Sequence, residues 1–182
     1  ETISLSAMFE LTVSPITANL SSYIDEGSSP ADAIYLSPAA GIESSHPEII
    51  AKAEQLVAGK EDNLEKARAI YQFVQQYIRY DPNAASRNQG ALAALREKAG
   101  VCEEYAALFV ALCRAVNIPA RQVNGYADPK GTGDCWRQPV QPFSLRGYRH
   151  SWAEFYLKGF GWLPADPAMN GSNINFRYFG SL

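Results

Sequence analysis

Cys102 is the residue in this chain best placed for covalent chemistry, because it stands in the first turn of a predicted apolar helix. Gly100 precedes it, and apolar side chains predominate after Glu104. The unpaired amides and the dipole at a helix start favour an anion, so a thiol there is expected to ionise to a reactive thiolate. A thiol that attacks a carbonyl also needs a base within reach.

Two histidines are candidates for that base. His46 lies in an irregular N-terminal region, whereas His150 opens a strongly strand-like segment, so His150 is the better candidate. Asp166 lies on the next predicted strand, where a carboxylate could hold the imidazole in one tautomer. The midpoint of positions 150 and 166 is residue 158, and Lys158-Gly159 is the natural place for the chain to reverse, so an antiparallel hairpin is expected to set them side by side. A hairpin centred on a residue needs a turn with an odd number of residues or a bulge, and Gly159 in a left-handed conformation would accommodate either.

Periodicity predicts the elements that position these residues. Apolar side chains at helical spacing indicate helices over 48–58, from 62 or 63 to about 80, over 91–98 and over 102–116. Strands are expected over 120–126, 150–157 and 162–166, with a last aromatic strand near 176–179. An N-terminal strand at 9–13 and a short extended piece at 33–36 are also expected. Helices first and antiparallel strands second predict an α+β fold around the buried helix 102–116.

The composition is that of an ordinary globular protein. Its 182 residues, 47% of them hydrophobic, are enough for one structural unit, with a strand and irregular arm over 1–60 and a core over 61–182. Sixteen Lys and Arg against 19 Asp and Glu give a formal charge of -3. No block of like charge indicates a nucleic-acid or anionic-lipid partner.

The longest apolar run, Tyr105 to Cys113, is far shorter than the roughly 20 residues that span a bilayer, so no membrane-spanning segment is expected. Residues 1–20 lack the features of a signal peptide, and the missing initiator Met indicates a piece of a longer protein. Its compartment and oligomeric state stay open, and an extracytoplasmic or cell-surface part of a larger protein is one option.

The three cysteines are too few and too irregularly spaced for a disulfide framework. Cys113 is expected to be a small buried hydrophobe inside the apolar helix. Cys135 lies in the long segment 128–147, where it could be a loop thiol, a site-lining residue or a redox partner of Cys102. The chain lacks CxxC spacing, which argues against a structural zinc site.

Four blocks of this sequence resemble the transglutaminase-like superfamily in order and spacing, and together they cover roughly residues 64–168. The similarity is to a prokaryotic-type transglutaminase core. It implies a papain-like fold with Cys102 as nucleophile, His150 as base and Asp166 as its partner, without a metal or organic cofactor. The blocks are Gly100-Val101-Cys102-Glu103-Glu104-Tyr105-Ala106, Ile118-Pro119-Ala120-Arg121 with Gly125-Tyr126, His150-Ser151-Trp152-Ala153-Glu154, and Gly161-Trp162-Leu163-Pro164-Ala165-Asp166-Pro167.

The implied reaction is acyl transfer through a thioester, from a protein or peptide amide to an amine or to water. The Cys102 backbone amide is a natural oxyanion donor. Gln89 and Trp136 are candidates for the second donor, and Trp152 is expected to be a core or site-wall aromatic or to stack on substrate. Two alternatives stay open: a binding or scaffolding module of a larger cell-surface protein, and a zinc-binding domain that uses Cys102, His150 and Asp166.

Overall fold

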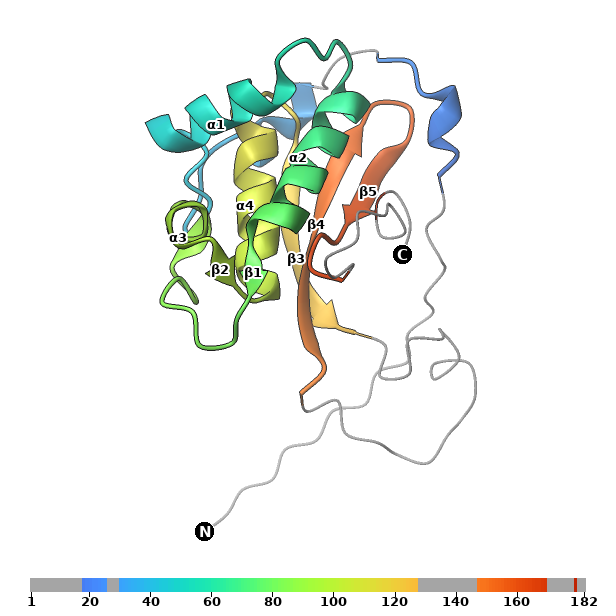
Figure 1. The fold of residues 1–182 in the computed structure, drawn as a ribbon. Coiled ribbons are helices and arrows are strands. Elements are labelled where there is room, and N and C mark those ends of the chain that lie inside the picture. Colours follow the sequence, from blue (N-terminus) through green and yellow to red (C-terminus); the bar gives the residue numbers. More distant parts are fainter. Residues whose placement is uncertain (1–17, 26–29, 128–146, 170–178, 180–182) are drawn as a thin grey trace, which may run out of the picture.

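The computed structural model describes residues 18–25, 30–127, 147–169 and 179, and shows helices packed against a small antiparallel sheet (Figure 1). Helix α4 is central, because it contacts the other three α-helices as well as strands β3 and β4. The predicted α+β class, with the Cys102 helix packed on an antiparallel sheet, is confirmed. The elements are η1 (Leu20–Ser22), η2 (Pro30–Tyr35), α1 (Pro47–Val57), α2 (Asn63–Tyr77), β1 (Arg79–Tyr80), α3 (Gly90–Glu97), β2 (Ala99–Gly100), α4 (Cys102–Ala115), β3 (Ala120–Tyr126), β4 (Arg149–Leu157) and β5 (Gly161–Ala165).

Helix α4 is buried along most of its length, as its nearly continuous apolar sequence predicts. The Phe109 ring packs edge-on against Tyr71 of α2, with ring centroids 6.4 Å apart, and against Phe155 of β4, with centroids 6.1 Å apart. Such aromatic pairs each contribute about 0.5–1.5 kcal/mol beyond the area they bury.

None of the helices in the described ranges is long and apolar enough to cross a membrane.

Local capping explains where α1 and α2 begin. The N–H of Glu48 donates to Nδ1 of His46, at 3.2 Å, ahead of Pro47 in the first turn of α1. Asp62 caps α2 by accepting a bond from the N–H of Glu65, at 2.7 Å. A side-chain cap of this kind contributes typically about 1 kcal/mol.

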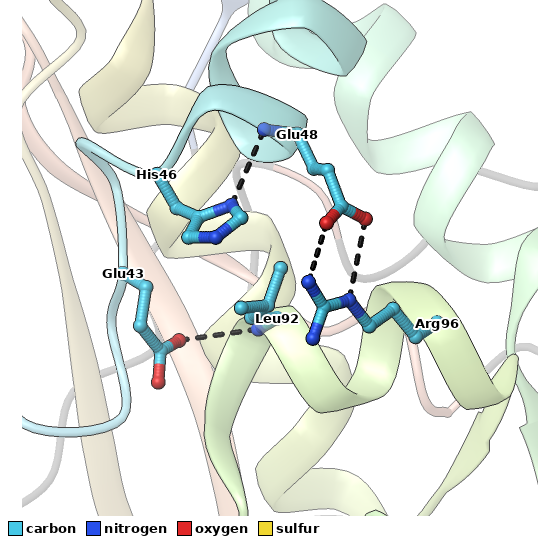
Figure 2. A network of polar contacts seen from close by, with 5 residues as sticks. All are labelled: Glu43, His46, Glu48, Leu92 and Arg96. Carbon is cyan, nitrogen blue, oxygen red and sulfur yellow. Dashed lines mark hydrogen bonds and ion pairs between the residues drawn. The ribbon is translucent and has the colours of Figure 1, made fainter.

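A polar network ties α1 to α3 (Figure 2). The Arg96 guanidinium donates two hydrogen bonds to the Glu48 carboxylate, with N···O distances of 2.5 and 3.3 Å. Glu43 accepts a bond from the N–H of Leu92 at 3.1 Å, near the start of α3. His46 therefore belongs to a helix start and to this network.

The sheet has the strand order β3-β4-β5, with both pairs antiparallel. The predicted strand at 120–126 is observed with those bounds, and the next two are observed within one residue of their predicted ends. Phe179 forms an isolated antiparallel bridge with Ala165, whereas residues 176–178 lie outside the described part of the chain, as does the predicted strand at 9–13.

Two expectations about local structure were wrong. The second helix ends at Tyr77, before the predicted end near 80, because Arg79 and Tyr80 pair in parallel with Ala99 and Gly100 and must be extended to do so. The predicted extended piece at 33–36 lies at the end of the 3-10 helix η2, where the N–H of Leu36 donates to the Ala33 carbonyl at 3.2 Å.

The start of α4 is held by Glu104, a buried carboxylate with 1% exposure. The N–H of Asn88 donates to its Oε1 at 2.7 Å, and the N–H of Val101 donates to its Oε2 at 3.0 Å. Gly100 gives this side chain room, because a Cβ there would lie 2.5 Å from the Cβ of Glu104. Glu104 thus fixes the backbone on which Cys102 stands.

We expect Glu104→Ala to lower the free energy of unfolding by about 2–3 kcal/mol, because it leaves two backbone donors without their acceptor. Urea denaturation measures this change. Glu103→Ala is the matched control, since the half-buried Glu103 carboxylate has no hydrogen-bond or ion-pair partner among the described residues; its expected change is within about 0.5 kcal/mol. Equal losses in both variants would contradict this role of Glu104.

Candidate active site

Cys102 is the first residue of α4 and is half-buried. Its thiol interacts with the His150 ring and with the backbone N–H of Ser151 on β4. Burial by itself raises the pKa of the Cys102 thiol, but these two hydrogen bonds and the charge of the imidazolium outweigh burial and lower the pKa below that of an ordinary thiol. The site therefore favours a thiolate next to an imidazolium.

His150 joins the thiol to a buried carboxylate. Its Nε2 lies 2.5 Å from Oδ2 of Asp166, and the two side chains are only 13% and 2% exposed. Burial lowers the pKa of His150, yet the hydrogen bonds to Asp166 and Cys102 and the charges of these groups raise it to about 9. Because Nε2 is bonded to Asp166, Nδ1 is the ring nitrogen left to exchange a proton with the thiol.

Asp166 is itself held by two further contacts. Its Oδ1 accepts a hydrogen bond from the N–H of Ala168 at 3.2 Å, and its carbonyl accepts one from the Tyr71 hydroxyl at 3.1 Å. Tyr71 is a fully buried residue of α2. The helical layer therefore helps to fix the end of β5 that carries the carboxylate.

The hairpin that brings His150 and Asp166 together is shifted from the predicted one. Ala153 pairs with Ala165 and Leu157 with Gly161, so the turn is centred on Gly159, and the extended register sets Asp166 opposite residue 152. Gly159 has φ +86, as an odd turn with a left-handed glycine predicts. His150 lies two positions before residue 152 on β4, so its side chain is on the same face of the sheet as that of residue 152. It therefore meets Asp166 diagonally across the two strands.

Trp152 supports the imidazole. Its ring stacks near the His150 ring, with centroids 6.2 Å apart and planes 25° apart. A Cβ at Gly125 would lie 2.8 Å from this indole, so the glycine of β3 leaves room for it. Trp152 therefore packs beside the imidazole, and its role as a site wall or as a stacking surface for substrate stays a prediction.

The other predicted site residues lie elsewhere. Gln89 is exposed just before α3 and does not line the cavity around the thiol, whereas Trp136 and Cys135 lie outside the described residues. Cys113 is fully buried within α4, and burial raises its pKa well above the usual value. Among the described residues, no group of three or more His, Cys, Asp and Glu is arranged to hold a metal ion.

A cavity of about 370 Å³ opens beside the thiol, and we call it the thiol cavity. Its lining comes from the start of α4, from the end of β3 and from the start of β4. It includes Cys102, Glu103, Asn124, Tyr126, Arg149 and His150. A peptide or small amide could thus reach the thiol from solvent.

Sequence reasoning missed the contribution of Tyr80. The parallel β1–β2 pairing sets Tyr80 opposite Gly100, two positions before the thiol. Burial raises the pKa of its phenol, and the nearby negative charge of Cys102 raises it further, although the ring is still 55% exposed. The charge interaction of Tyr80 with Cys102 is a link to the thiol that no residue spacing had indicated.

Comparison with known proteins identifies the family to which this arrangement belongs. The sequence profile of the transglutaminase-like superfamily matches residues 50–167. The chain belongs to this superfamily. Cys102, His150 and Asp166 all lie within the matched part of this transglutaminase-like chain.

Its relatives are longer proteins. An uncharacterised protein of Haemophilus influenzae is 32% identical over 134 residues, which are 66% of this chain and 36% of that protein. The kyphoscoliosis peptidase of mouse is 35% identical over 101 residues, which are 53% of this chain and 14% of the peptidase. This transglutaminase-like chain therefore spans well under half the length of these relatives.

Solved structures show the same fold. A candidate cysteine protease from Cytophaga hutchinsonii superimposes with a TM-score of 0.62 at 23% identity, over 91% of this chain and 48% of that one. The periplasmic domain of TgpA from Pseudomonas aeruginosa gives a TM-score of 0.58 at 22% identity, over 78% of this chain and 49% of that one. The predicted transglutaminase-like and cysteine-protease fold is thus confirmed.

We expect iodoacetamide to label Cys102 much faster than Cys113, at a pH well below the free-thiol pKa of ~8.5, because only the thiolate reacts. Mass spectrometry of a Cys135→Ser variant, followed over a pH series, measures both rates. His150→Ala should move the midpoint of Cys102 labelling to higher pH, since it removes a hydrogen bond and a positive charge. His46→Ala is the control and should leave the midpoint in place. Equal or slower labelling of Cys102 in the folded, reduced protein would contradict the activated thiolate.

Proposed function

We propose that this chain is a cysteine-dependent enzyme that transfers the acyl group of a protein or peptide amide through a thioester on Cys102. The observation that carries this proposal is the connected arrangement of thiol, imidazole and buried carboxylate, with His150 Nε2 2.5 Å from Asp166 Oδ2. Cys102 acts as nucleophile, His150 as acid and base, and Asp166 orients the imidazole and stabilises its charge.

The first half of the reaction starts from the ion pair of the Cys102 thiolate and the His150 imidazolium. The Cys102 thiolate attacks the amide carbonyl, so that a C–S bond forms and a tetrahedral oxyanion develops. As the C–N bond breaks, the His150 imidazolium passes its proton to the leaving nitrogen, which departs from a glutamine side chain as ammonia. A thioester and a neutral imidazole remain.

The second half restores the enzyme. An amine or a water molecule attacks the thioester while neutral His150 takes its proton, and the C–S bond breaks to return the thiolate. An amine gives transamidation, and water gives deamidation or proteolysis. By microscopic reversibility, the incoming nucleophile approaches from the side by which the first amine left.

The developing oxyanion needs hydrogen-bond donors. The backbone N–H of Cys102, at the start of α4, is one candidate, and the hydroxyl of Tyr80, which interacts electrostatically with Cys102, is a second. A phenol is protonated, and therefore a donor, through the neutral range, and the raised pKa of Tyr80 extends that range further.

A second candidate function is a binding or scaffolding module. The lengths of the relatives favour placing this domain within a larger protein, and the TgpA domain it resembles in fold is periplasmic, which supports an extracytoplasmic location. Against a purely binding role, a pKa of His150 near 9 and a lowered thiol pKa are properties that catalysis uses and that binding alone does not require.

We expect Cys102 to form a thioester with a glutamine-containing peptide, and Cys102→Ala to form none. Intact-protein mass spectrometry at short times detects the adduct as the donor mass minus ammonia. Supplying the same donor with and without a primary amine then separates the two outcomes, since conjugate indicates transfer and ammonia without conjugate indicates hydrolysis. A protein whose Cys102 is readily alkylated yet never acylated by a broad donor set would favour the binding role.

We expect Asp166→Asn to lower kcat by about 10²–10⁴, as loss of an orienting carboxylate does in comparable triads. Activity should fall as the pH rises through about 9, because the imidazolium then loses the proton that the leaving amine needs. Without the carboxylate the pKa of His150 drops, so this alkaline limb should move to lower pH. A pH series of kcat measures both effects.

The matched control is Glu154→Gln, which removes a carboxylate from β4 that pairs with Arg121 at 2.6 Å. Its kcat and its alkaline limb should be those of the unmodified protein. An Asp166→Asn variant that loses activity without moving the limb would show that Asp166 acts only through stability.

A further inference from the structure

A second hollow adjoins the thiol cavity and shares one residue with it. This side cavity has a volume of about 260 Å³ and lies between the segment before α3, the first turns of α4 and strand β3. Glu103 lines both cavities, so this residue stands at their junction. A substrate held at the thiol could therefore extend past Glu103 into the side cavity.

The two glutamates of this region differ in what they bind. Glu104 has a structural role, because its carboxylate oxygens accept hydrogen bonds from the N–H groups of Asn88 and Val101 at 2.7 and 3.0 Å. Glu103 has no such partner in the part of the chain that the structure describes. Its carboxylate is therefore available to a ligand.

The described lining of the side cavity includes two acidic residues, Glu103 and Glu104, and no positive charge to compensate them. No Lys or Arg is among the described residues that line it, and Arg149 lines only the thiol cavity. Its uncharged polar side chains are those of Asn88 and Gln122. The small residues Gly41, Gly90 and Ala107 line the rest of the cavity and leave room for an alkyl chain. The combination of a free carboxylate with small apolar walls matches a lysine-like or arginine-like group.

The glycine walls are close-packed. A Cβ at Gly90 would lie 2.7 Å from the Gly41 Cα, and Gly90 has φ +87. A larger residue there would meet backbone that cannot turn aside. The side cavity is therefore built by backbone packing as well as by movable side chains.

We propose that the side cavity binds a cationic group of the substrate, an alkylammonium or a guanidinium, through the Glu103 carboxylate. The inference deepens the proposed acyl transfer at Cys102 and rests on it. The cation comes either from a basic side chain of the polypeptide donor or from the amine acceptor. In the second case the ammonium loses a proton to solvent before attack, and His150 takes another as the C–N bond forms.

A bound cation would also offset an unfavourable charge. The negative charge of Glu103 opposes ionisation of Cys102, which is its next neighbour in sequence. A cation paired with Glu103 would weaken this repulsion and favour the thiolate. Substrate binding and nucleophile activation would thus reinforce one another.

The test compares charged and uncharged substrates in two arms. In the donor arm, glutamine peptides carry Lys, Arg or norleucine beside the glutamine. In the acceptor arm, pentylamine is compared with pentanehydrazide, which is uncharged near neutral pH. The measured quantity is kcat/KM for the cationic substrate divided by that for its neutral counterpart. Glu103→Gln should lower this ratio about 10- to 150-fold in at least one arm, the range expected for loss of a charged hydrogen bond.

Glu97→Gln is the matched control, since Glu97 is exposed at the end of α3 and lines neither cavity. It should leave both ratios unchanged. A loss in the donor arm assigns the cation to the polypeptide, and a loss in the acceptor arm assigns it to the amine. Thioester formation with both ratios unaltered in Glu103→Gln would overturn the cation site alone. Absence of any thioester in the unmodified protein would overturn the proposed function and this inference with it.

Discussion

The site depends on one charge-assisted hydrogen bond, from the imidazole of His150 to the buried carboxylate of Asp166. A carboxylate that is almost fully removed from water needs partners, and here it has the imidazole and the N–H of Ala168. The bond in turn sets the tautomer and the orientation of the ring. With Nε2 engaged, Nδ1 is the nitrogen left for the thiol, and the pKa values of the imidazole and the thiol move in opposite directions.

The thiol reaches this imidazole because two layers of the fold meet at α4. Phe109 packs against Tyr71 on the helical side and Phe155 on the sheet side, and Tyr71 also bonds the Asp166 carbonyl. A helix packed this tightly cannot slide without loss of these contacts. Its first turn, held by Glu104, therefore presents Cys102 to β4 at a fixed position.

Charge around the thiol is divided between structure and function. Glu104 uses its carboxylate to satisfy backbone donors, whereas its neighbour Glu103 faces two cavities and lacks a partner among the described residues. Adjacent residues on a helix point about 100° apart, so neighbouring glutamates can face different surroundings. One of them stabilises the helix start, and the other is the residue that we propose binds a substrate cation.

The sequence by itself determined the fold class, most element bounds, the family and the three residues of the candidate triad, because these depend on local periodicity and on residue type. It also predicted an antiparallel hairpin between the last two strands with a left-handed Gly159 in its turn, since strand pattern and glycine position are local features. The tertiary structure decided the rest. Only packing of the turn set its centre at Gly159 and made the His150 contact diagonal. Only the parallel pairing of β1 with β2 shortened α2 and brought Tyr80 toward the thiol. The separate tasks of Glu103 and Glu104 were equally hidden, because they depend on partners from distant segments that no local spacing records.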